Sequence, residues 1–230
     1  MKDLSDFEKK ISYQFKNKNL LTEAFTHRSY LNENPSWSGA HNERLEFLGD
    51  AVLELVVTES LFSVFPEKPE GELTSIRAAL VNAIMLSGLA SELEMNNCLI
   101  LSRGEAKDVG RARGYILANA FEALVGAIYL DGGYSAVKIF IEKNLLTKTG
   151  EVLEKELYRD AKSLFQERAQ EFAGITPNYR VLEEWGPDHD KHFIVGVYLA
   201  DSVAGKGEGP SKQIAEQNAA DSALSAKGWK

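Results

Sequence analysis

The chain has 230 residues, of which 44% are hydrophobic, and this length and content fit one large or two smaller globular domains. Its formal net charge of −8 excludes a uniformly basic nucleic-acid binder, and residues 159–230 are not basic either, with nine Lys and Arg against eleven Asp and Glu. One cysteine, Cys98, excludes an internal disulfide framework and fits a reducing cytosol, and we expect neither a membrane span nor a signal peptide.

The first part of the chain, residues 3–157, has apolar residues at helical spacing and no convincing period-two segment. After an initial helix the pattern predicts further helices over 20–26, 42–65, 73–93 and 116–130. Pro66 and Pro69 break the chain after the long helix at 42–65, and the Gly132-Gly133 pair ends the last one.

The pattern changes after Tyr158. A helix is predicted over 161–172, followed by weak alternation over 178–185 and clear alternation over 192–200, which indicates strands. Three glycines at positions 205, 207 and 209 are interpreted as a loop, and 214–226 as an alanine-rich helix. The order is therefore helix, three strands, helix, and the charged stretch 151–160 is the expected junction.

Three acidic residues, Glu43, Glu46 and Asp50, lie at offsets of 0, 3 and 7 in the run 42–50. On a helix they share one face, beside a separate apolar set that includes Leu45 and Leu48. A row of acids beside a buried stripe is unfavourable unless a positive charge faces it, and Mg²⁺ or Mn²⁺, which prefer carboxylate oxygen, would supply one. The alternative is an acidic helix face that is only solvated.

A second informative segment, 116–131, contains Asn119 and Glu122, which are three residues apart and share a helical face. Between the two segments lies Glu70-Gly71. Together the segments resemble the catalytic signature of the ribonuclease III family, and the likeness extends over essentially the whole chain.

The resemblance implies a multi-domain protein, with an all-α catalytic domain over 1–157 and an α-β-β-β-α double-stranded RNA-binding domain over 160–230. It implies Mg²⁺, with Mn²⁺ as a substitute, and cleavage of double-stranded RNA to 5′-phosphate and 3′-hydroxyl ends. By position, the catalytic and metal-binding residues are Glu46, Asp50, Asn119 and Glu122, and the supporting acids are Glu43 and Glu70.

Asn119 departs from the family, which usually has aspartate there. An amide offers a carbonyl oxygen to a metal but carries no charge and cannot accept a proton as a carboxylate does. Three interpretations stay open: a natural variation that the other acids tolerate, an engineered knock-out, or a natural protein that binds RNA without cutting it.

The family also implies a homodimer, a cytoplasmic location and roles in processing ribosomal-precursor and messenger RNA, with no membrane partner. Phe47 resembles a dimer-contact residue, although an ordinary core aromatic is the alternative. The basic stretch 101–113 resembles the family's glycine-rich loop, which faces phosphate or is only solvated. For His27, a structural hydrogen bond is a better interpretation than catalysis.

In the second domain, three elements are expected to touch RNA. Its first helix offers side chains for 2′-hydroxyl groups, the loop 186–191 enters a minor groove, and the start of its last helix faces phosphate. The residues expected there are Ser163, Gln166, Glu167, His189, Ser211 and Lys212. Gln213 stands where the family often has another lysine, which predicts weaker binding and a shallower salt dependence.

Two rival functions are considered. A catalytically inactive binder of double-stranded RNA would be consistent with Asn119. A helical di-metal carboxylate protein would normally have a histidine three residues after a glutamate. None follows Glu43, Glu46 or Glu122 in that way, and this rival leaves residues 160–229 unexplained.

Overall fold

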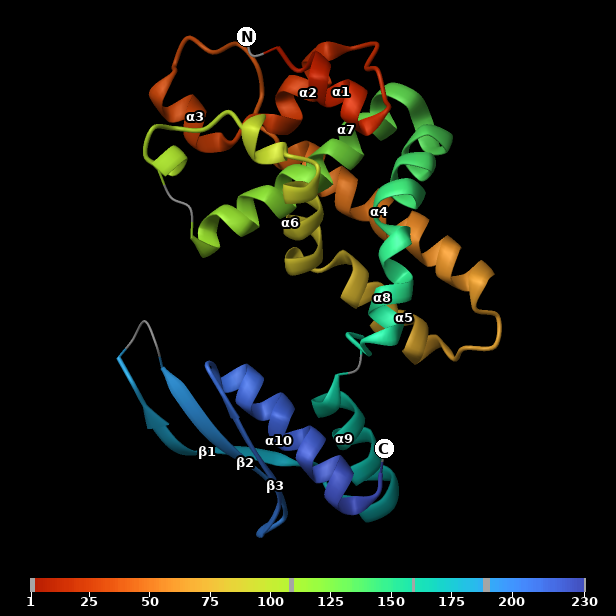
Figure 1. Cartoon of the computed structure of the whole chain (residues 1–230), viewed down its shortest axis with the longest axis vertical. Coiled ribbons are helices and arrows are strands. Elements are labelled where there is room, and N and C mark those ends of the chain that lie inside the picture. Colours follow the sequence, from red (N-terminus) through yellow and green to blue (C-terminus); the bar gives the residue numbers. More distant parts are fainter. Residues whose placement is uncertain (1–2, 108–109, 159, 188–190, 230) are drawn as a thin grey trace. The chain divides into compact units, whose positions relative to one another are not determined.

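The computed structural model describes residues 3–107, 110–158, 160–187 and 191–229. The chain divides into two compact units, Met1–Tyr158 (unit 1) and Arg159–Lys230 (unit 2), and each has its own hydrophobic core. Unit 1 is helical, and unit 2 holds two helices and a three-stranded sheet (Figure 1). The predicted fold class, helical and then α-β-β-β-α, is confirmed.

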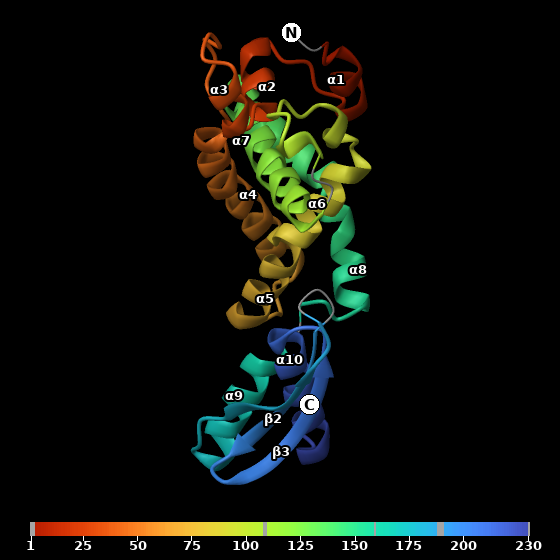
Figure 2. The ribbon, with the colours of Figure 1, turned by 90° about the vertical axis from the view of Figure 1, so that its left-hand side faces the viewer.

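Unit 1 is built from short helices around two long ones. Its α-helices are α1 Ser5–Ile11, α2 Lys18–Phe25, α3 Arg28–Glu33, α4 Glu43–Val64, α5 Glu70–Val81, α6 Ala83–Glu92, α7 Arg111–Asn144 and α8 Thr149–Glu154. Short 3₁₀ turns lie at Met95–Asn97, Glu105–Lys107 and Leu146–Lys148. The core lies where α4 and α7 pack together, with α2 and α6 also against α7 (Figures 1 and 2).

The predicted helix over 73–93 is wrong, because two helices occupy this span. Asn82 has an extended backbone and separates α5 from α6. Its side-chain oxygen accepts a hydrogen bond from the backbone N–H of Met85 at 2.9 Å and so caps α6.

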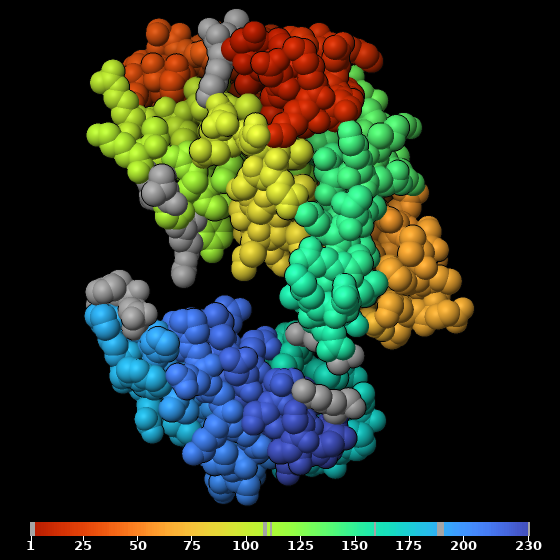
Figure 3. All heavy atoms as spheres, in the orientation of Figure 1, coloured from red at the N-terminus to blue at the C-terminus, as the bar shows by residue number. Residues whose placement is uncertain are grey.

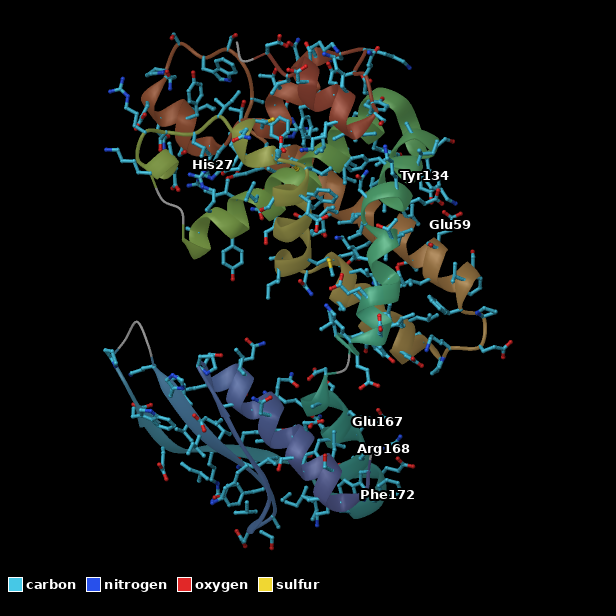
Figure 4. All side chains as sticks on the ribbon, viewed as in Figure 1. His27, Glu59, Tyr134, Glu167, Arg168 and Phe172 are labelled. Atoms are coloured by element: carbon cyan, nitrogen blue, oxygen red, sulfur yellow. The ribbon has the colours of Figure 1, made fainter. Side chains whose placement is uncertain are left out.

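The glycine pair 132–133 ends the first helical part of α7, as predicted, and a second helical part follows directly across a kink. Gly133 has a φ of 75°, which glycine adopts without steric cost, and the helix resumes to Asn144. Beyond the bend, Tyr134 donates a hydrogen bond to Glu59 of α4, and Lys138 Nζ lies 3.1 Å from Glu59 Oε2. Figure 4 shows Tyr134 and Glu59 facing one another.

The N-terminal segment is held by polar contacts to later parts of unit 1. Lys10 Nζ lies 2.8 Å from Glu94 Oε1, and Figure 3 shows the red N-terminal segment against the yellow one that contains Glu94. The run Ala112–Glu154 is long and apolar enough by composition to cross a membrane, which the sequence analysis did not anticipate. Its central residues, from Leu117 to Ile128, form much of the core of unit 1, as in the central helix of a globular domain.

Unit 2 packs two helices, α9 Ala161–Ala173 and α10 Lys212–Lys227, on an antiparallel sheet of order β1-β2-β3 (Figure 2). The strands are β1 Asn178–Trp185, β2 His192–Leu199 and β3 Ser202–Gly209. β2 supplies the buried strand residues Phe193, Val195, Val197 and Leu199.

The predicted glycine loop is wrong, because its three glycines belong to β3. A Cβ on Gly207 would lie 2.1 Å from the backbone nitrogen of Ala219, and one on Gly205 2.6 Å from its oxygen. The glycines therefore let α10, which faces them with buried alanines, approach the sheet backbone closely.

Candidate active site

The candidate site lies where α4 and α7 cross at backbone contact. A Cβ on Gly49 would lie 1.7 Å from the carbonyl oxygen of Glu122, and one on Gly126 would lie 2.3 Å from that of Leu45. No larger residue fits at either glycine without moving a helix. The crossing therefore brings Asp50, which follows Gly49, close to Glu122.

The electrostatics of this crossing are unfavourable to negative charge. Burial first, and then the negative charges of Asp50 and Glu46, raise the pKa of Glu122 to about 7. The pKa of Glu46 is also raised, first by burial and then by Glu43 and Asp50, while a hydrogen bond from the Asn119 side chain opposes the rise. Of the four side chains predicted to form one cluster, Glu46, Asp50 and Glu122 therefore interact through their charges, and Asn119 joins them through Glu46.

The cluster has the chemistry of a site for a hard cation. It combines three carboxylates with one amide, and oxygen ligands of this kind suit Mg²⁺ and Mn²⁺. In the described residues, however, no three His, Cys, Asp or Glu side chains already lie close enough together to hold one ion. The oxygen ligands therefore fit the ion in kind, but their side chains lie too far apart to coordinate one ion together as they stand.

The two predicted supporting acids lie in different places. Glu43 starts α4 at the cluster, where Arg28 Nη1 lies 3.3 Å from its Oε1 and His41 Nδ1 accepts from its backbone N–H at 3.4 Å. Glu70 starts α5 and lines a pocket of about 400 Å³ with Leu61 and Phe62 of α4. That end of α4 lies about 22 Å along the helix from Glu46. Glu70 does not join the cluster within one chain.

Phe47 is 83% exposed, so the interpretation as an ordinary core aromatic is wrong. It belongs to an exposed row on α4 that also includes Leu55, at 56% exposed, and Phe62, at 73%. The row continues to the pocket beside Glu70, which Phe62 helps to line.

His27 has a structural role, as expected. Its Nδ1 accepts from the backbone N–H of Ser29 at 3.3 Å and so caps α3, and it lies 2.8 Å from the Ser29 hydroxyl. The Ser29 hydroxyl accepts in turn from the backbone N–H of Ser102 at 3.2 Å. Burial lowers the pKa of His27, which favours its neutral form.

The basic stretch, which runs into the first turn of α7, is only partly available to phosphate. Arg113 donates to the carbonyl oxygen of Glu105 at 2.7 Å and to Asn96 Oδ1 at 3.3 Å, so it fastens the loop to the body of unit 1. Arg103 and Lys107 are exposed.

In unit 2, three of the predicted RNA-binding residues share the exposed side of α9. Ser163, Gln166 and Glu167 line a groove of about 560 Å³, and Glu167 is labelled on this helix in Figure 4. Ser163 donates to Asp160 Oδ2 at 2.6 Å, which orients its hydroxyl.

The start of α10 carries the other predicted RNA contacts. Ser211 caps the helix by accepting from the backbone N–H of Ile214 at 3.3 Å, as expected. Lys212 Nζ lies 5.6 Å from the ring centre of Phe193, so the cation rests against the end of β2. His189 lies outside the described residues.

Sequence reasoning missed the role of Gly49 and Gly126. The sequence does contain a signal, because a glycine inside a helix lowers its stability by about 1 kcal/mol relative to alanine, so a glycine there indicates a close contact or another special role. Both glycines lie within four residues of a predicted catalytic acid.

Comparisons with known proteins cover both units. A ribonuclease-III-like family model matches residues 17–149, and a double-stranded RNA binding motif matches residues 161–226. Ribonuclease 3 of Nitratiruptor sp. is 45% identical over 224 residues, which is 97% of this chain and 96% of that protein. Ribonuclease 3 of Desulfotalea psychrophila is 46% identical over 220 residues, 96% and 91% of the two chains.

Solved structures of the nuclease domain of ribonuclease III from Campylobacter jejuni resemble unit 1. One is 39% identical with a TM-score of 0.58, and covers 64% of this chain and 97% of its own. Another, described for structural flexibility in the region involved in dimer formation, is 40% identical with a TM-score of 0.56, and covers 63% and 99%.

Proposed function

This chain belongs to the ribonuclease III family and is an endoribonuclease that acts on double-stranded RNA, and we propose that it does so with Mg²⁺ at the crossing of α4 and α7. The observation that carries this proposal is the meeting of Glu46, Asp50 and Glu122 at this crossing, where burial and then the charges of Asp50 and Glu46 raise the pKa of Glu122 to about 7. A bound divalent cation would relieve the repulsion among these charges.

The ion would be held by Glu46, Asp50 and Glu122, with the carbonyl oxygen of Asn119 as a neutral donor. When bound, Mg²⁺, or Mn²⁺ in its place, supplies an activated water and neutralises charge that develops on the phosphate. The carboxylates fix the direction from which water reaches phosphorus. In-line attack expels the 3′ oxygen, which takes up a proton, and so leaves 5′-phosphate and 3′-hydroxyl ends.

Unit 2 would hold the duplex. The polar side of α9, with Ser163, Gln166 and Glu167, suits the 2′-hydroxyl groups of an A-form minor groove. The free N–H groups at the start of α10, together with Ser211 and Lys212, suit phosphate. The substrates we propose are structured ribosomal-precursor and messenger RNAs in the cytoplasm.

A homodimer would place two such sites on one duplex. If two α4 helices pack antiparallel about a twofold axis near Glu54 and Leu55, Phe47 of one copy meets Phe62 of the other, because 47 and 62 are equally far from that centre. Phe47 then faces the 400 Å³ pocket of the other copy, and that copy's Glu70 comes near the cluster. This arrangement accounts for both the exposure of Phe47 and the distance of Glu70 from the other acids.

Exposure of the α4 row supports this dimer, as does the dimer formation named for the Campylobacter jejuni nuclease domain. The molar mass, measured by light scattering as the protein elutes from a size-exclusion column, tests this dimer. Phe47→Ala is expected to give a monomer, whereas Ile139→Ala, which removes another exposed apolar side chain, leaves a dimer. A dimeric Phe47→Ala protein would contradict the arrangement.

Asn119 favours one alternative, a binder of duplex RNA that does not cut. The two functions are separated by incubating a labelled duplex with Mg²⁺ and either the wild-type chain or Asn119→Asp. We expect the wild type to cut and the variant to cut about tenfold faster at limiting Mg²⁺, because the fourth carboxylate binds the ion more tightly. Cleavage by the variant alone would establish the binder, and cleavage by neither would overturn the enzymatic proposal.

A further inference from the structure

In the first half of α7, Ala112 and Tyr115 are exposed, and Asn119 and Glu122 are partly exposed. The spacings of three, four and three residues place these side chains on one helical face. Between Asn119 and Gly126 the other side chains are buried, so the two active-site residues form the inner end of this face. The next bulky side chain outward along it is Tyr115.

Tyr115 is 57% exposed and unused by the fold. In the part of the chain that the structure describes, its hydroxyl has no hydrogen-bond partner and its ring no aromatic or cationic neighbour. The preceding residue, Gly114, has no side chain that could cover the ring.

The backbone under Tyr115 is nevertheless well anchored. Arg113, two residues earlier, is bound to the carbonyl oxygen of Glu105 at 2.7 Å, and Leu117, two residues later, is buried in the core. An exposed ring on a fixed helix can direct a substrate, whereas one on a loose segment would have to be ordered first. A solvated tyrosine without function is the ordinary alternative.

We propose that Tyr115 is a substrate-positioning residue, whose hydroxyl binds a ribose 2′-hydroxyl of the strand being cut and whose ring packs on that ribose. The proposal rests on the function proposed above. Tyr115 lies about 6 Å along α7 from Asn119, so a strand whose scissile phosphate reaches the cluster passes within its reach. The minor groove of A-form RNA is wide and shallow and displays its 2′-hydroxyls, which a surface tyrosine can contact.

The test compares Tyr115→Phe and Tyr115→Ala with the wild-type chain, with Ile139→Ala as control. Ile139 is a comparably exposed side chain, at 65%, and lies on α7 beyond the bend at Gly133. Single-turnover rates and KM are measured on a duplex of defined sequence and on versions with one 2′-deoxynucleotide at each position near the cut. The melting temperature of each variant, expected to equal that of the wild type, controls for folding.

We expect Tyr115→Ala to slow the single-turnover step about tenfold with little change in KM, because a misplaced phosphate reacts slowly. One 2′-deoxy position should slow the wild type about threefold and leave Tyr115→Phe unaffected, because the hydroxyl that reads it is gone. The proposal is overturned if Tyr115→Ala cuts within twofold of wild type, or if every 2′-deoxy effect persists in Tyr115→Phe.

Failure of the proposed function has a different result. If neither the wild type nor Asn119→Asp cuts the duplex, the nuclease proposal fails, and Tyr115 is then judged by the affinity of the full chain for the same duplexes without metal. A threefold weaker affinity in Tyr115→Ala, absent from Ile139→Ala, supports the contact. Equal affinities reject it.

Discussion

Two carboxylates on α7 show opposite uses of the same chemical group. Glu122 faces Asp50 and Glu46 across the helix crossing, and its pKa is raised to about 7. Asp131, nine residues later, accepts hydrogen bonds from the backbone N–H groups of Asn17 and Lys16 at 2.8 and 2.9 Å and from the hydroxyl of Tyr13 at 2.8 Å. Burial raises the pKa of Asp131, but these three donors outweigh it and the net shift is downward.

The two carboxylates therefore contribute to different properties, Asp131 to the stability of the fold and Glu122 to function. Charge on Asp131 is matched within the chain, so it fastens the N-terminal segment to the bend of α7. No donor or cation among the described residues pairs with the charge on Glu122, so this charge lowers the stability of the folded chain unless a positive charge binds beside it. Perturbed carboxylates of the second kind are typical of active sites.

Replacing the unmatched carboxylate is expected to have the largest effect. Glu122→Gln should lower the cleavage rate about 1000-fold, a loss typical of removing one group that stabilises charge in the transition state. The same variant should be about 1 kcal/mol more stable than wild type at pH 8 without metal, because the repelled charge is gone. Rate assays and urea unfolding measure the two effects, and a less stable variant would contradict the comparison.

Replacing the matched carboxylate should do the reverse. Asp131→Ala removes the acceptor of three hydrogen bonds and is expected to lower the free energy of unfolding by about 3 kcal/mol. Cleavage at a temperature where the variant stays folded should be within about twofold of wild type. Glu142→Ala, which removes an exposed carboxylate of the same helix, is the control for urea unfolding. An equal loss in both variants would show that the contacts of Asp131 contribute nothing.

The two groups also predict opposite slopes of stability with pH. The pKa of Glu122 is higher in the folded chain than in the unfolded one, so its contribution is present below pH 4.5 and is lost as the pH rises to about 7. The pKa of Asp131 is lower in the folded chain, so its contribution is present above pH 3.8 and is lost as the pH falls through the folded value. Melting temperatures without metal at pH 5 and pH 8 should differ less in Glu122→Gln than in wild type, and an unchanged difference would refute the assignment.

The smallest expected effect is at Tyr13. Tyr13→Phe removes only one of the three hydrogen bonds to Asp131 and should cost about 1 kcal/mol. Unfolding in urea measures it, and Tyr115→Phe, which also loses a tyrosine hydroxyl but no hydrogen bond in the described structure, is the matched control. Equal stability of the two variants would show that the backbone N–H groups of Lys16 and Asn17 hold Asp131 without help from the Tyr13 hydroxyl.

Much of unit 1 follows from the sequence, because its two long helices are rich in apolar residues and because Pro66 follows α4 and Gly132-Gly133 interrupts α7. The break at Asn82 was missed, although an asparagine before Ala83-Ile84 is a common helix cap. Strand β3 was missed for a different reason. Glycine has low strand propensity, and only the close approach of α10, which is a tertiary effect, makes it suitable at 205, 207 and 209.

The site was partly predictable. Spacing alone places Glu46 with Asp50, and Asn119 with Glu122, each pair on one helix face. Bringing the pairs together required the family resemblance, because periodicity along one helix does not reveal what crosses it. Glu70 shows the limit, since its place at the far end of α4 depends on the path of the chain after Phe65.

The contact between Gly49 and Gly126 has a consequence for how the enzyme tolerates mutation. The gap between the acidic side chains of α4 and those of α7 is set by main-chain atoms in contact, so it depends less on the size of nearby apolar side chains than a crossing packed through side chains would. A single methyl group at either glycine is the exception, because it would push α4 and α7 apart where they cross and widen the distance between the carboxylates that we propose hold the ion.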